Sequence, residues 1–587
     1  MQTILGIFLL VMSTSVLVMF KTGQDIFLLL LKPGAAYAGD VEHVAAVSQP
    51  PGDEADVPLH LQVIESLRSS SSVIPGIPDV HPVHTVFNRE AIIPPQCYTR
   101  TEGKHNPCYV CHQAPVEGRE NVMNDFGLQA AYSFSDAGLT NHWSNLFEDR
   151  SERVAAISDA EILEWINTDN YSALDGRLAE SEFDGWAPDL KNLHMAAAAF
   201  DEHGFAKDGS HWVAFNYKPL PSTFWPTNGS TDDVMIRLPE IYRSDEDGNY
   251  SLDVYRANLA ILEATIKGLD SITSLPVDER VLQRDLDKDG KLGVTTDIRD
   301  IKFYTGQASK LASFRHMYPA GTEFLHTVRY VGVDEAGNVS VSTRMKEVRY
   351  MRKWRSYGKR VYARQYQLEE FEKEAGNLPR YHYLGHNGLD NKFGWSIHGF
   401  IEGRDGELRE NTFEENMFCM GCHTSIGSTI DKTFSFARKI DGAQGWGYID
   451  LRGMPDAPNH GESKGEILTY FERVGGGDEF RSNEEMLQRW FKADRTSVDH
   501  AKVSAAADVY QLITPSRERA LELNKAYRVI VEDQDFIFGR DATIKSPINV
   551  YDEVDNEKSP TLPAENIYQW DIRLDWGAGD HSVADVR

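Results

Sequence analysis

Two short motifs constrain this chain more than any other feature of its sequence. Residues 108–112 read Cys-Tyr-Val-Cys-His, and residues 419–423 read Cys-Met-Gly-Cys-His. Residues three positions apart lie on one face of a helical turn, so each motif presents two thiols side by side, directly followed by a histidine. Each segment is therefore expected to fold as a turn that points both thiols and the imidazole toward one common group.

This geometry suits covalent attachment of haem. Two neighbouring thiols can add to the two vinyl groups of a porphyrin, and the next histidine can reach the iron from one face of the ring. We therefore predict two covalently bound haem c groups. The cofactor-binding residues are Cys108, Cys111 and His112 for one group and Cys419, Cys422 and His423 for the other, with His112 and His423 as proximal iron ligands.

Two other interpretations of the motifs are a structural zinc site and a pair of redox-active cysteines. Zinc would need further cysteine or histidine ligands in a compact cluster, yet 311 residues separate His112 from His423. A redox pair would not need a histidine after both motifs. The fifth cysteine, Cys97, is expected to pack as a small buried side chain, with a reactive thiol or an iron ligand as the alternatives.

On these two motifs the chain resembles the c-type cytochromes, and the resemblance covers little else. In the dihaem cytochrome c peroxidases and the rubber oxygenases the two motifs lie closer together, and their other motifs do not match this sequence. Haem c domains are usually small and helical. The resemblance therefore implies mainly α haem c domains with an inserted β-containing region, an α+β multidomain chain.

The second axial ligand of each iron decides between electron transfer and catalysis, because only an open iron face can bind a substrate. Met454 lies beside Gly453 and Pro455, and a methionine in such a downstream loop is the distal ligand of many small cytochromes c. His326 shares one face of a predicted strand with Phe324 and could face a haem. The alternatives are a packed loop methionine and a core histidine. Further histidines that remain open are His105, His386 and His398.

A calcium site is predicted between the two motifs. Asp285, Asp287 and Asp289 alternate along the chain, and Gly290 occupies the sixth position, where a calcium loop needs a sharp turn. The twelfth position holds Thr296 where the EF-hand pattern has glutamate. The alternative is an acidic turn without an ion.

The length of 587 residues favours several domains. We divide the chain into a signal peptide or anchor (1–38), an N-terminal arm (39–95), a first haem c domain (96–235), a middle region with the calcium loop and a β-hairpin (236–380), a second haem c domain (381–525) and a C-terminal tail (526–587).

Local patterns predict several elements. Alternation over 327–333 and 338–344 around a short turn predicts a β-hairpin. A helical pattern covers 362–375. Capping boxes that begin at Ser158 and Ser482 predict two further helix starts.

Charge and the first residues bear on location. Lys and Arg number 60 against 89 Asp and Glu, and the net charge of −29 argues against nucleic-acid binding. Apolar runs over 4–20 and 26–31 precede Ala36-Tyr37-Ala38, a small-x-small cleavage pattern. We expect export to the periplasm or beyond, with a retained inner-membrane anchor as the alternative. Because residues 1–38 contain no cysteine, no lipid anchor is expected.

These observations predict an exported dihaem c-type cytochrome that transfers electrons between redox partner proteins, with membrane contact only if the first segment is retained. One alternative is a dihaem oxidoreductase, peroxidase-like or oxygenase-like, with one open haem. Another is a subunit of an electron-conducting assembly. Whether the protein is an enzyme stays open.

Overall fold

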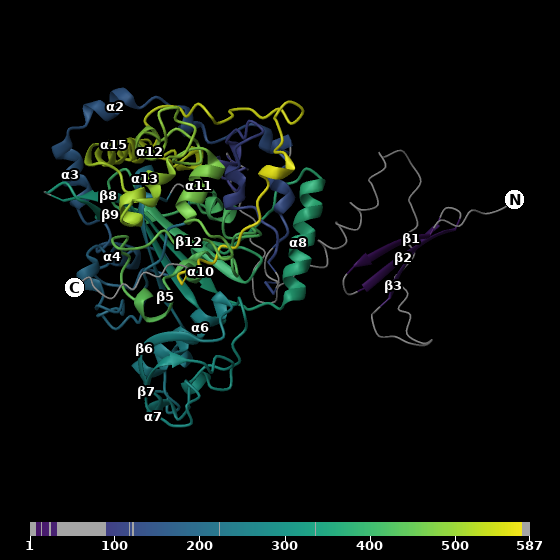
Figure 1. Cartoon of the computed structure of the whole chain (residues 1–587), viewed down its shortest axis with the longest axis vertical. Coiled ribbons are helices and arrows are strands. Elements are labelled where there is room, and N and C mark those ends of the chain that lie inside the picture. Colours follow the sequence, from purple (N-terminus) through teal and green to yellow (C-terminus); the bar gives the residue numbers. More distant parts are fainter. Residues whose placement is uncertain are drawn as a thin grey trace. The chain divides into compact units, whose positions relative to one another are not determined.

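The computed structural model describes residues 7–12, 15–22 and 25–31, and residues 88–577 apart from positions 89, 117, 120–122, 135, 222–223 and 335. The chain forms two compact units, residues 1–70 and 71–587. The first contains a three-stranded antiparallel sheet (Figure 1). Its strands are β1 (Ile7–Met12), β2 (Ser15–Thr22) and β3 (Asp25–Leu31). No helix within the described ranges is both long and apolar enough to cross a membrane.

An eight-stranded antiparallel sheet forms the centre of the second unit (Figure 1). The strands follow the order β10-β11-β12-β9-β8-β5-β4, and β13 pairs with β12. Their bounds are β4 (Val213–Ala214), β5 (Thr231–Arg237), β8 (Glu323–Val333), β9 (Val339–Lys353), β10 (His382–Tyr383), β11 (Leu389–Asp390), β12 (Trp395–Glu402) and β13 (Leu408–Glu410).

Both faces of this sheet are buried. Phe324 and Met351 belong to one hydrophobic core, whereas their chain neighbours Leu325 and Tyr350 belong to another on the opposite face. Successive residues of a strand point to opposite faces, so apolar side chains at both kinds of position require cover on both sides. Long connecting segments and helices, among them the 17-residue helix over Arg517–Asp533, supply that cover.

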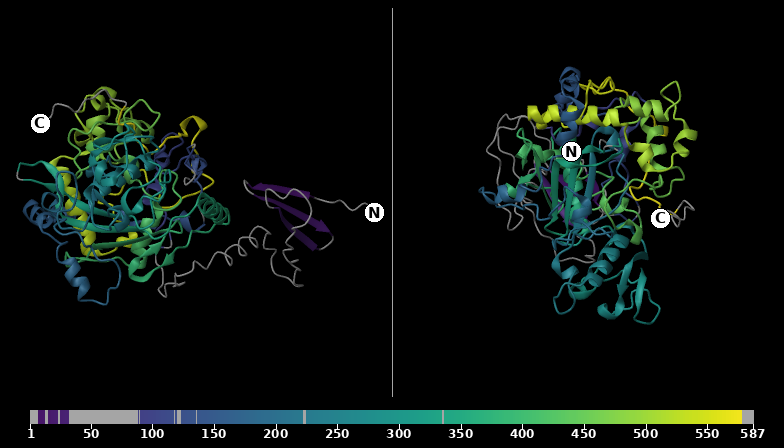
Figure 2. Two further views of the ribbon diagram at one scale, coloured as in Figure 1. Left: turned by 90° about the horizontal axis from the view of Figure 1, so that it is seen from below. Right: turned by 90° about the vertical axis from the view of Figure 1, so that its left-hand side faces the viewer.

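The helices are distributed around the sheet; the long helix α15 packs on β8 and contacts α2 and α3 (Figures 1 and 2). Their bounds are α2 (Ser151–Ala156), α3 (Asp159–Asn167), α4 (Leu174–Ala179), α5 (Ala196–Ala199), α6 (Leu252–Lys267), α7 (Glu279–Leu282), α8 (Lys359–Glu374), α9 (Phe413–Met417), α10 (Ser435–Arg438), α11 (Glu466–Val474), α12 (Glu484–Trp490), α13 (His500–Ser504), α14 (Val509–Ile513) and α15 (Arg517–Asp533).

A smaller lobe contains the predicted calcium loop. The two-stranded antiparallel sheet of β6 (Ile272–Asp278) and β7 (Val294–Ile298) packs against α6, at the lower end of Figure 1. The loop between α7 and β7 carries the three predicted aspartates.

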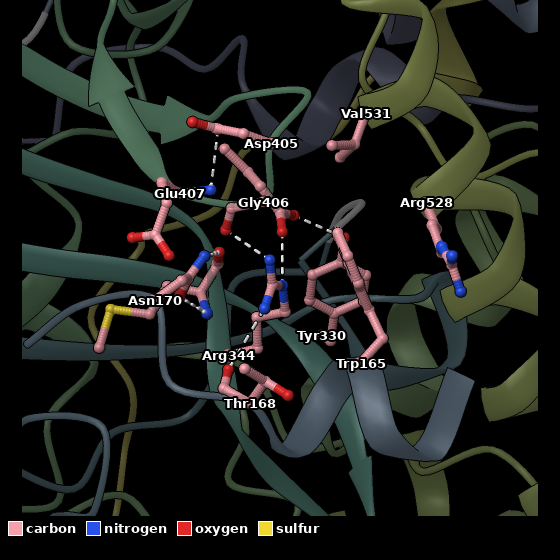
Figure 3. A network of polar contacts seen from close by, with 12 residues as sticks. Trp165, Thr168, Asn170, Tyr330, Arg344, Asp405, Gly406, Glu407, Arg528 and Val531 are labelled. Atoms are coloured by element: carbon pink, nitrogen blue, oxygen red, sulfur yellow. Dashed lines mark hydrogen bonds and ion pairs between the residues drawn. The ribbon is translucent and has the colours of Figure 1, made fainter. Parts of the chain in front are cut away.

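A buried polar network joins helix α3 to the sheet (Figure 3). Arg344 Nε donates to Glu402 Oε1 at 2.5 Å, and the guanidinium also donates to the Gly406 carbonyl. Tyr330 donates its hydroxyl to Glu402 and accepts from Trp165 Nε1 at 3.0 Å. The Arg344 guanidinium lies 3.8 Å from the Trp165 ring centroid. The network supplies hydrogen-bond donors to the Glu402 carboxylate, which is fully buried.

The predicted fold class is wrong. The second unit is not a set of mainly helical haem c domains, because an eight-stranded sheet organises it and both motifs lie on segments packed around that sheet. The sequence signal was weak because strands buried on both faces lack the apolar–polar alternation of half-exposed strands.

Several local predictions are confirmed, and one is wrong. The hairpin exists as β8 and β9, with Val333 opposite Val339. The helix predicted over 362–375 is α8, and the Ser158 capping box opens α3. The second box is displaced by one residue, because Asn483 caps α12. Glu485 of that helix instead accepts from the backbone and hydroxyl of Ser516.

Candidate functional site

Each motif forms one helical turn, as its spacing predicts. The first begins in a 3₁₀ turn over Pro107–Val110, and the second lies on a 3₁₀ turn over Phe418–Gly421. His112 N donates to the Cys108 carbonyl at 2.9 Å, and His423 N makes the equivalent bond to Cys419 at 3.0 Å. The two thiols and the histidine of each motif are therefore held within a single turn.

The two motifs meet in space although they are distant in sequence. Ser428 N, just after the second motif, donates to the Cys111 carbonyl of the first at 3.1 Å. Gln113 Nε2, just after the first motif, donates to the Gly427 carbonyl at 2.6 Å. These bonds place both motifs in one site.

Glycine makes this contact between the motifs close. A Cβ atom at position 427 would lie 2.4 Å from Asp125 Oδ1 and 2.6 Å from the Gln113 carbonyl oxygen. A Cβ atom on Gly421, inside the second motif, would lie 2.9 Å from the Ile92 carbonyl oxygen. A side chain at either position would push the segments apart.

The imidazole of the first motif is held by a carboxylate. His112 Nδ1 lies 3.0 Å from Asp125 Oδ2. The same carboxylate accepts from Gln113 N at 2.8 Å and from Gly427 N at 3.1 Å. A ring that donates from Nδ1 has its lone pair on Nε2, which is the arrangement of a metal-binding histidine.

The imidazole of the second motif is held by a backbone carbonyl. His423 Nδ1 lies 2.9 Å from the Lys432 carbonyl oxygen, and Asn391 Nδ2 donates to the His423 carbonyl at 2.7 Å. Burial lowers the pKa of His423 to about 4, and the nearby His326 and the Arg349 guanidinium act in the same direction. The ring is therefore neutral near pH 7, the form that binds a metal.

All five cysteines are free thiols. Four of them, Cys97, Cys108, Cys111 and Cys422, lie close enough together to affect one another's pKa values. Burial raises the pKa of Cys108 and Cys422 to about 11 and that of Cys97 to about 12. The pKa of Cys111 is also raised, first by burial and then by the proximity of Cys422 and Cys97. The predicted role of Cys97 as a small packed residue is therefore incomplete, because its thiol lies near both motifs.

The thiols and imidazoles of the motifs form no compact group of three ligand atoms within the described residues. Within the part of the chain that the structure describes, the one group of at least three potential ligands whose ligand atoms lie within 4.8 Å of one another is Glu279, Asp285 and Asp287. A zinc ion needs about four ligands at roughly 2.0–2.3 Å. Each motif instead offers two thiols and one imidazole within one turn, a donor set whose chemistry suits a covalently attached haem.

One predicted distal ligand, His326, lies close to the second motif. It sits in β8 opposite Arg349 of β9 and contributes to the lowered pKa of His423. Its Nε2 atom lies 3.4 Å from Asp232 Oδ2, which also accepts from the Tyr217 hydroxyl. Asp232 in turn lines a cavity of about 520 Å³ between the sheet and the 448–452 loop. A chain of contacts therefore leads from this cavity to His326, which lies close enough to His423 to affect its pKa.

The other predicted distal ligand, Met454, is packed in the apolar core with 2% of its surface exposed. Its carbonyl accepts from Val509 N, which ties its loop to α14. Whether its sulfur binds iron stays a prediction. His105 is half-buried and His398 is enclosed, and burial lowers their pKa values to about 4 and 3. His386 is held by Glu410 at 2.9 Å.

The predicted calcium loop gathers two of its three aspartates. Asp285 and Asp287 converge with Glu279, which the sequence pattern did not indicate because it precedes the loop. Glu279 Oε1 accepts from Leu286 N at 2.6 Å, and its Oε2 accepts from Gly293 N at 3.0 Å. Asp289 lies outside this group and accepts from Lys291 N.

Comparison with known proteins identifies the family. A family model described as "-like lipoprotein" matches residues 80–511. A protein named "Uncharacterized lipoprotein" from Aquifex aeolicus (strain VF5) is 32% identical over 549 residues, which cover 82% of this chain and 92% of the relative. The chain belongs to this lipoprotein family. No solved structure matches it.

This assignment corrects the predicted identification as a c-type cytochrome, and the cytochrome and haem descriptors that went with it. Neither the family description nor the relative's name mentions a cytochrome or haem. Membership in a lipoprotein family shows that the protein is exported, as predicted. The expectation that no lipid anchor is present disagrees with the family's description, although residues 1–38 contain no cysteine.

Sequence reasoning missed the residues that support the motifs. Asp125 and the Lys432 carbonyl orient the two imidazoles, and Arg349 lies beside the second pair of thiols. No local pattern marks them. A search for acidic residues soon after a CxxCH motif would have found Asp125, which follows His112 by 13 positions.

Proposed function

We propose that this lipoprotein-family member carries two covalently attached haem groups and transfers electrons between redox partners outside the cytoplasm. The observation that carries the proposal is the state of the two imidazoles. His112 and His423 both engage Nδ1 with an acceptor, at 3.0 and 2.9 Å, and so present Nε2 as the ligand atom. When bound, haem would supply a one-electron carrier at each motif.

The chain itself would bind, orient and shield these groups. Cys108 and Cys111 would hold one group, Cys419 and Cys422 the other, and the contacts between Gln113 and Gly427 would keep the two close together. Burial keeps the thiols protonated until they react. We further propose a periplasmic or cell-surface location, which the exported family supports.

The test is covalent haem content. The full chain is produced in cells that export it and attach haem, and its intact mass is measured after acid denaturation and organic extraction. We expect a mass increase equal to two haem groups. Cys108→Ala and Cys419→Ala should each weaken attachment at one site, whereas Cys97→Ala serves as the matched control and should retain both groups. Haem that is fully extracted, or no haem at all, contradicts the proposal.

A second candidate function is an oxidoreductase, and one observation favours it. The cavity that Asp232 lines has a volume of about 520 Å³, which lies in the range of small-molecule sites. Asp232 also contacts His326 near the second motif. An open iron at that motif would bind carbon monoxide after reduction, with a spectral shift. A protein whose two irons both fail to bind carbon monoxide is a carrier.

A further inference from the structure

The two motif histidines differ in the charge of their hydrogen-bond acceptors. His112 Nδ1 lies 3.0 Å from a carboxylate oxygen of Asp125, and His423 Nδ1 lies 2.9 Å from the neutral carbonyl oxygen of Lys432. The distances are nearly equal, so the charge of the acceptor is the main difference. Asp125 is enclosed, with 4% of its surface exposed, and solvent therefore screens its charge poorly.

This difference affects how strongly each imidazole donates electrons. A carboxylate that accepts the Nδ1 proton raises the basicity of the ring, and a more basic ligand stabilises the oxidised iron. A neutral carbonyl acceptor raises the basicity of the ring less. The first site should therefore be harder to reduce than the second.

The surroundings of the second motif act in the same direction. The Arg349 guanidinium lies close enough to Cys419 and Cys422 for each to affect its pKa. Arg540 lies 4.9 Å from the ring of Phe418, the residue directly before the motif. Enclosed positive charge favours the reduced form of a nearby redox centre.

We infer that Asp125 is a positioning residue that lowers the reduction potential of the first site below that of the second, so that electrons pass from the first motif to the second. In each transfer, the group at Cys108 and Cys111 loses one electron and the group at Cys419 and Cys422 gains it. This inference rests on the proposed function.

Asp125 also has a structural role that an experiment must separate from its charge. Its carboxylate accepts from Gln113 N and from Gly427 N and so joins the two motifs. Asp125→Asn removes the charge and keeps the size. Asp125→Glu keeps the charge on a longer side chain. A structural role alone would alter stability in both variants without a potential change that follows the charge.

The experiment begins with the intact mass of the full chain, which establishes whether both haem groups are present. A spectroelectrochemical titration then gives two midpoints. In Asp125→Asn we expect the lower midpoint to rise by at least a tenfold change in the reduction equilibrium, about 59 mV for one electron, while the upper midpoint stays in place. Asp125→Glu should return the lower midpoint toward that of the wild type.

Asp233→Asn is the matched control. Asp233 is also enclosed, with 1% of its surface exposed, and its carboxylate bonds to Thr327 and Arg329. It contacts neither motif histidine through these bonds, so both midpoints should stay where they are in the wild type.

Three results would overturn the inference. The first is that both midpoints stay unchanged in an Asp125→Asn protein that retains two haem groups. The second is that Asp125→Asn and Asp125→Glu shift the lower midpoint equally. If the Asn variant does not fold, paramagnetic NMR of the wild type can assign the midpoints to the two irons, and a higher potential at the His112 iron refutes the inference. Absence of haem in the first mass measurement refutes the proposed function instead, and the inference with it.

Discussion

At the scale of single residues, the site depends on atoms outside the two motifs. The cysteines and histidines establish which groups can bind, but the acceptors at Nδ1 establish which ring atom faces the ligand. Gly427 matters in the same way, because its missing side chain lets the segment after the second motif contact Asp125 and Gln113. The chemistry of the site is therefore distributed over segments that lie far apart in the sequence.

Gly427→Ala should destabilise the protein. The added methyl group would lie 2.4 Å from Asp125 Oδ1 and 2.6 Å from the Gln113 carbonyl oxygen, closer than van der Waals contact allows. Forcing an extra carbon into a packed interior typically costs about 1–3 kcal/mol. We expect a loss of that size in the free energy of unfolding, measured by urea denaturation.

Gly176→Ala is the control for this prediction. Gly176 lies in helix α4, and a Cβ atom there would meet nothing within 4 Å. Alanine should stabilise that helix by about 0.5–1 kcal/mol relative to glycine. Equal effects of the two substitutions would show that the motifs do not approach each other as closely as the structure has them.

The residue scale also shows what the sequence could not reveal. Cys97 was expected to be a packed side chain, and only the fold brings its thiol near both motifs. The contact between Asp125 and Gly427 spans 302 positions, and no local periodicity encodes such a pair. The motif residues themselves were visible because their spacing within one turn is a purely local property.

At the scale of elements, local signals predicted local structure well. The β8–β9 hairpin, helix α8 and the Ser158 capping box all depend on residues within one element or one turn. The large sheet was missed because some of its strands pair across long intervening segments and because both of its faces are covered. β5, for example, pairs with β8 at Val234 and His326.

Chelation should destabilise the lobe that contains the calcium loop. If Glu279, Asp285 and Asp287 bind calcium, the bound ion stabilises only the folded state, and its removal lowers the melting temperature. The measurement is thermal unfolding with and without millimolar chelator, followed by calcium add-back.

Two variants make the calcium test specific. Asp285→Asn should abolish the effect of the chelator, because Asp285 belongs to the converging group. Asp289→Asn should preserve most of it, because Asp289 lies outside that group and accepts from a backbone amide. A wild-type melting temperature that is insensitive to chelator removes calcium from this loop.

The network in Figure 3 predicts a large effect of one arginine. Burial raises the pKa of Glu402 to about 7 even though Arg344 opposes the shift. Arg344→Met would leave Glu402 enclosed without its cationic partner, and breaking a buried pair in this way typically costs about 3–5 kcal/mol. Urea denaturation at pH 8 should show a loss of that order.

Arg153→Met provides the comparison. Arg153 pairs with Asp533 at 2.7 Å, but 45% of its side chain is exposed. Exposed pairs contribute about 0–1 kcal/mol. If the two arginine substitutions cost the same, the Arg344 network does not hold α3 against the sheet.

At the scale of the whole molecule, burial on both faces of the sheet places many polar groups inside. His398 is the clearest case. It lies in β12 with 1% of its surface exposed, its ring contacts Phe183 and Phe400, and neither nitrogen has a hydrogen-bond partner among the described residues. The interior therefore tolerates only the neutral ring, and global stability should depend on pH.

His398→Leu should make the protein less sensitive to acid. Burial, with a smaller effect from nearby His386, lowers the pKa of His398 to about 3, below its ordinary value of 6.5. Between these values the unfolded chain binds a proton that the folded chain does not, so the free energy of unfolding falls as pH falls through that window. One pH unit corresponds to about 1.4 kcal/mol, so between pH 7 and pH 5 the wild type should lose about 2 kcal/mol more than the variant. Urea denaturation at both pH values measures this difference.

His500→Leu is the control, because it removes an exposed histidine and should leave the acid sensitivity almost unchanged. An identical loss in the wild type and in His398→Leu would show that His398 can accept a proton in the folded state.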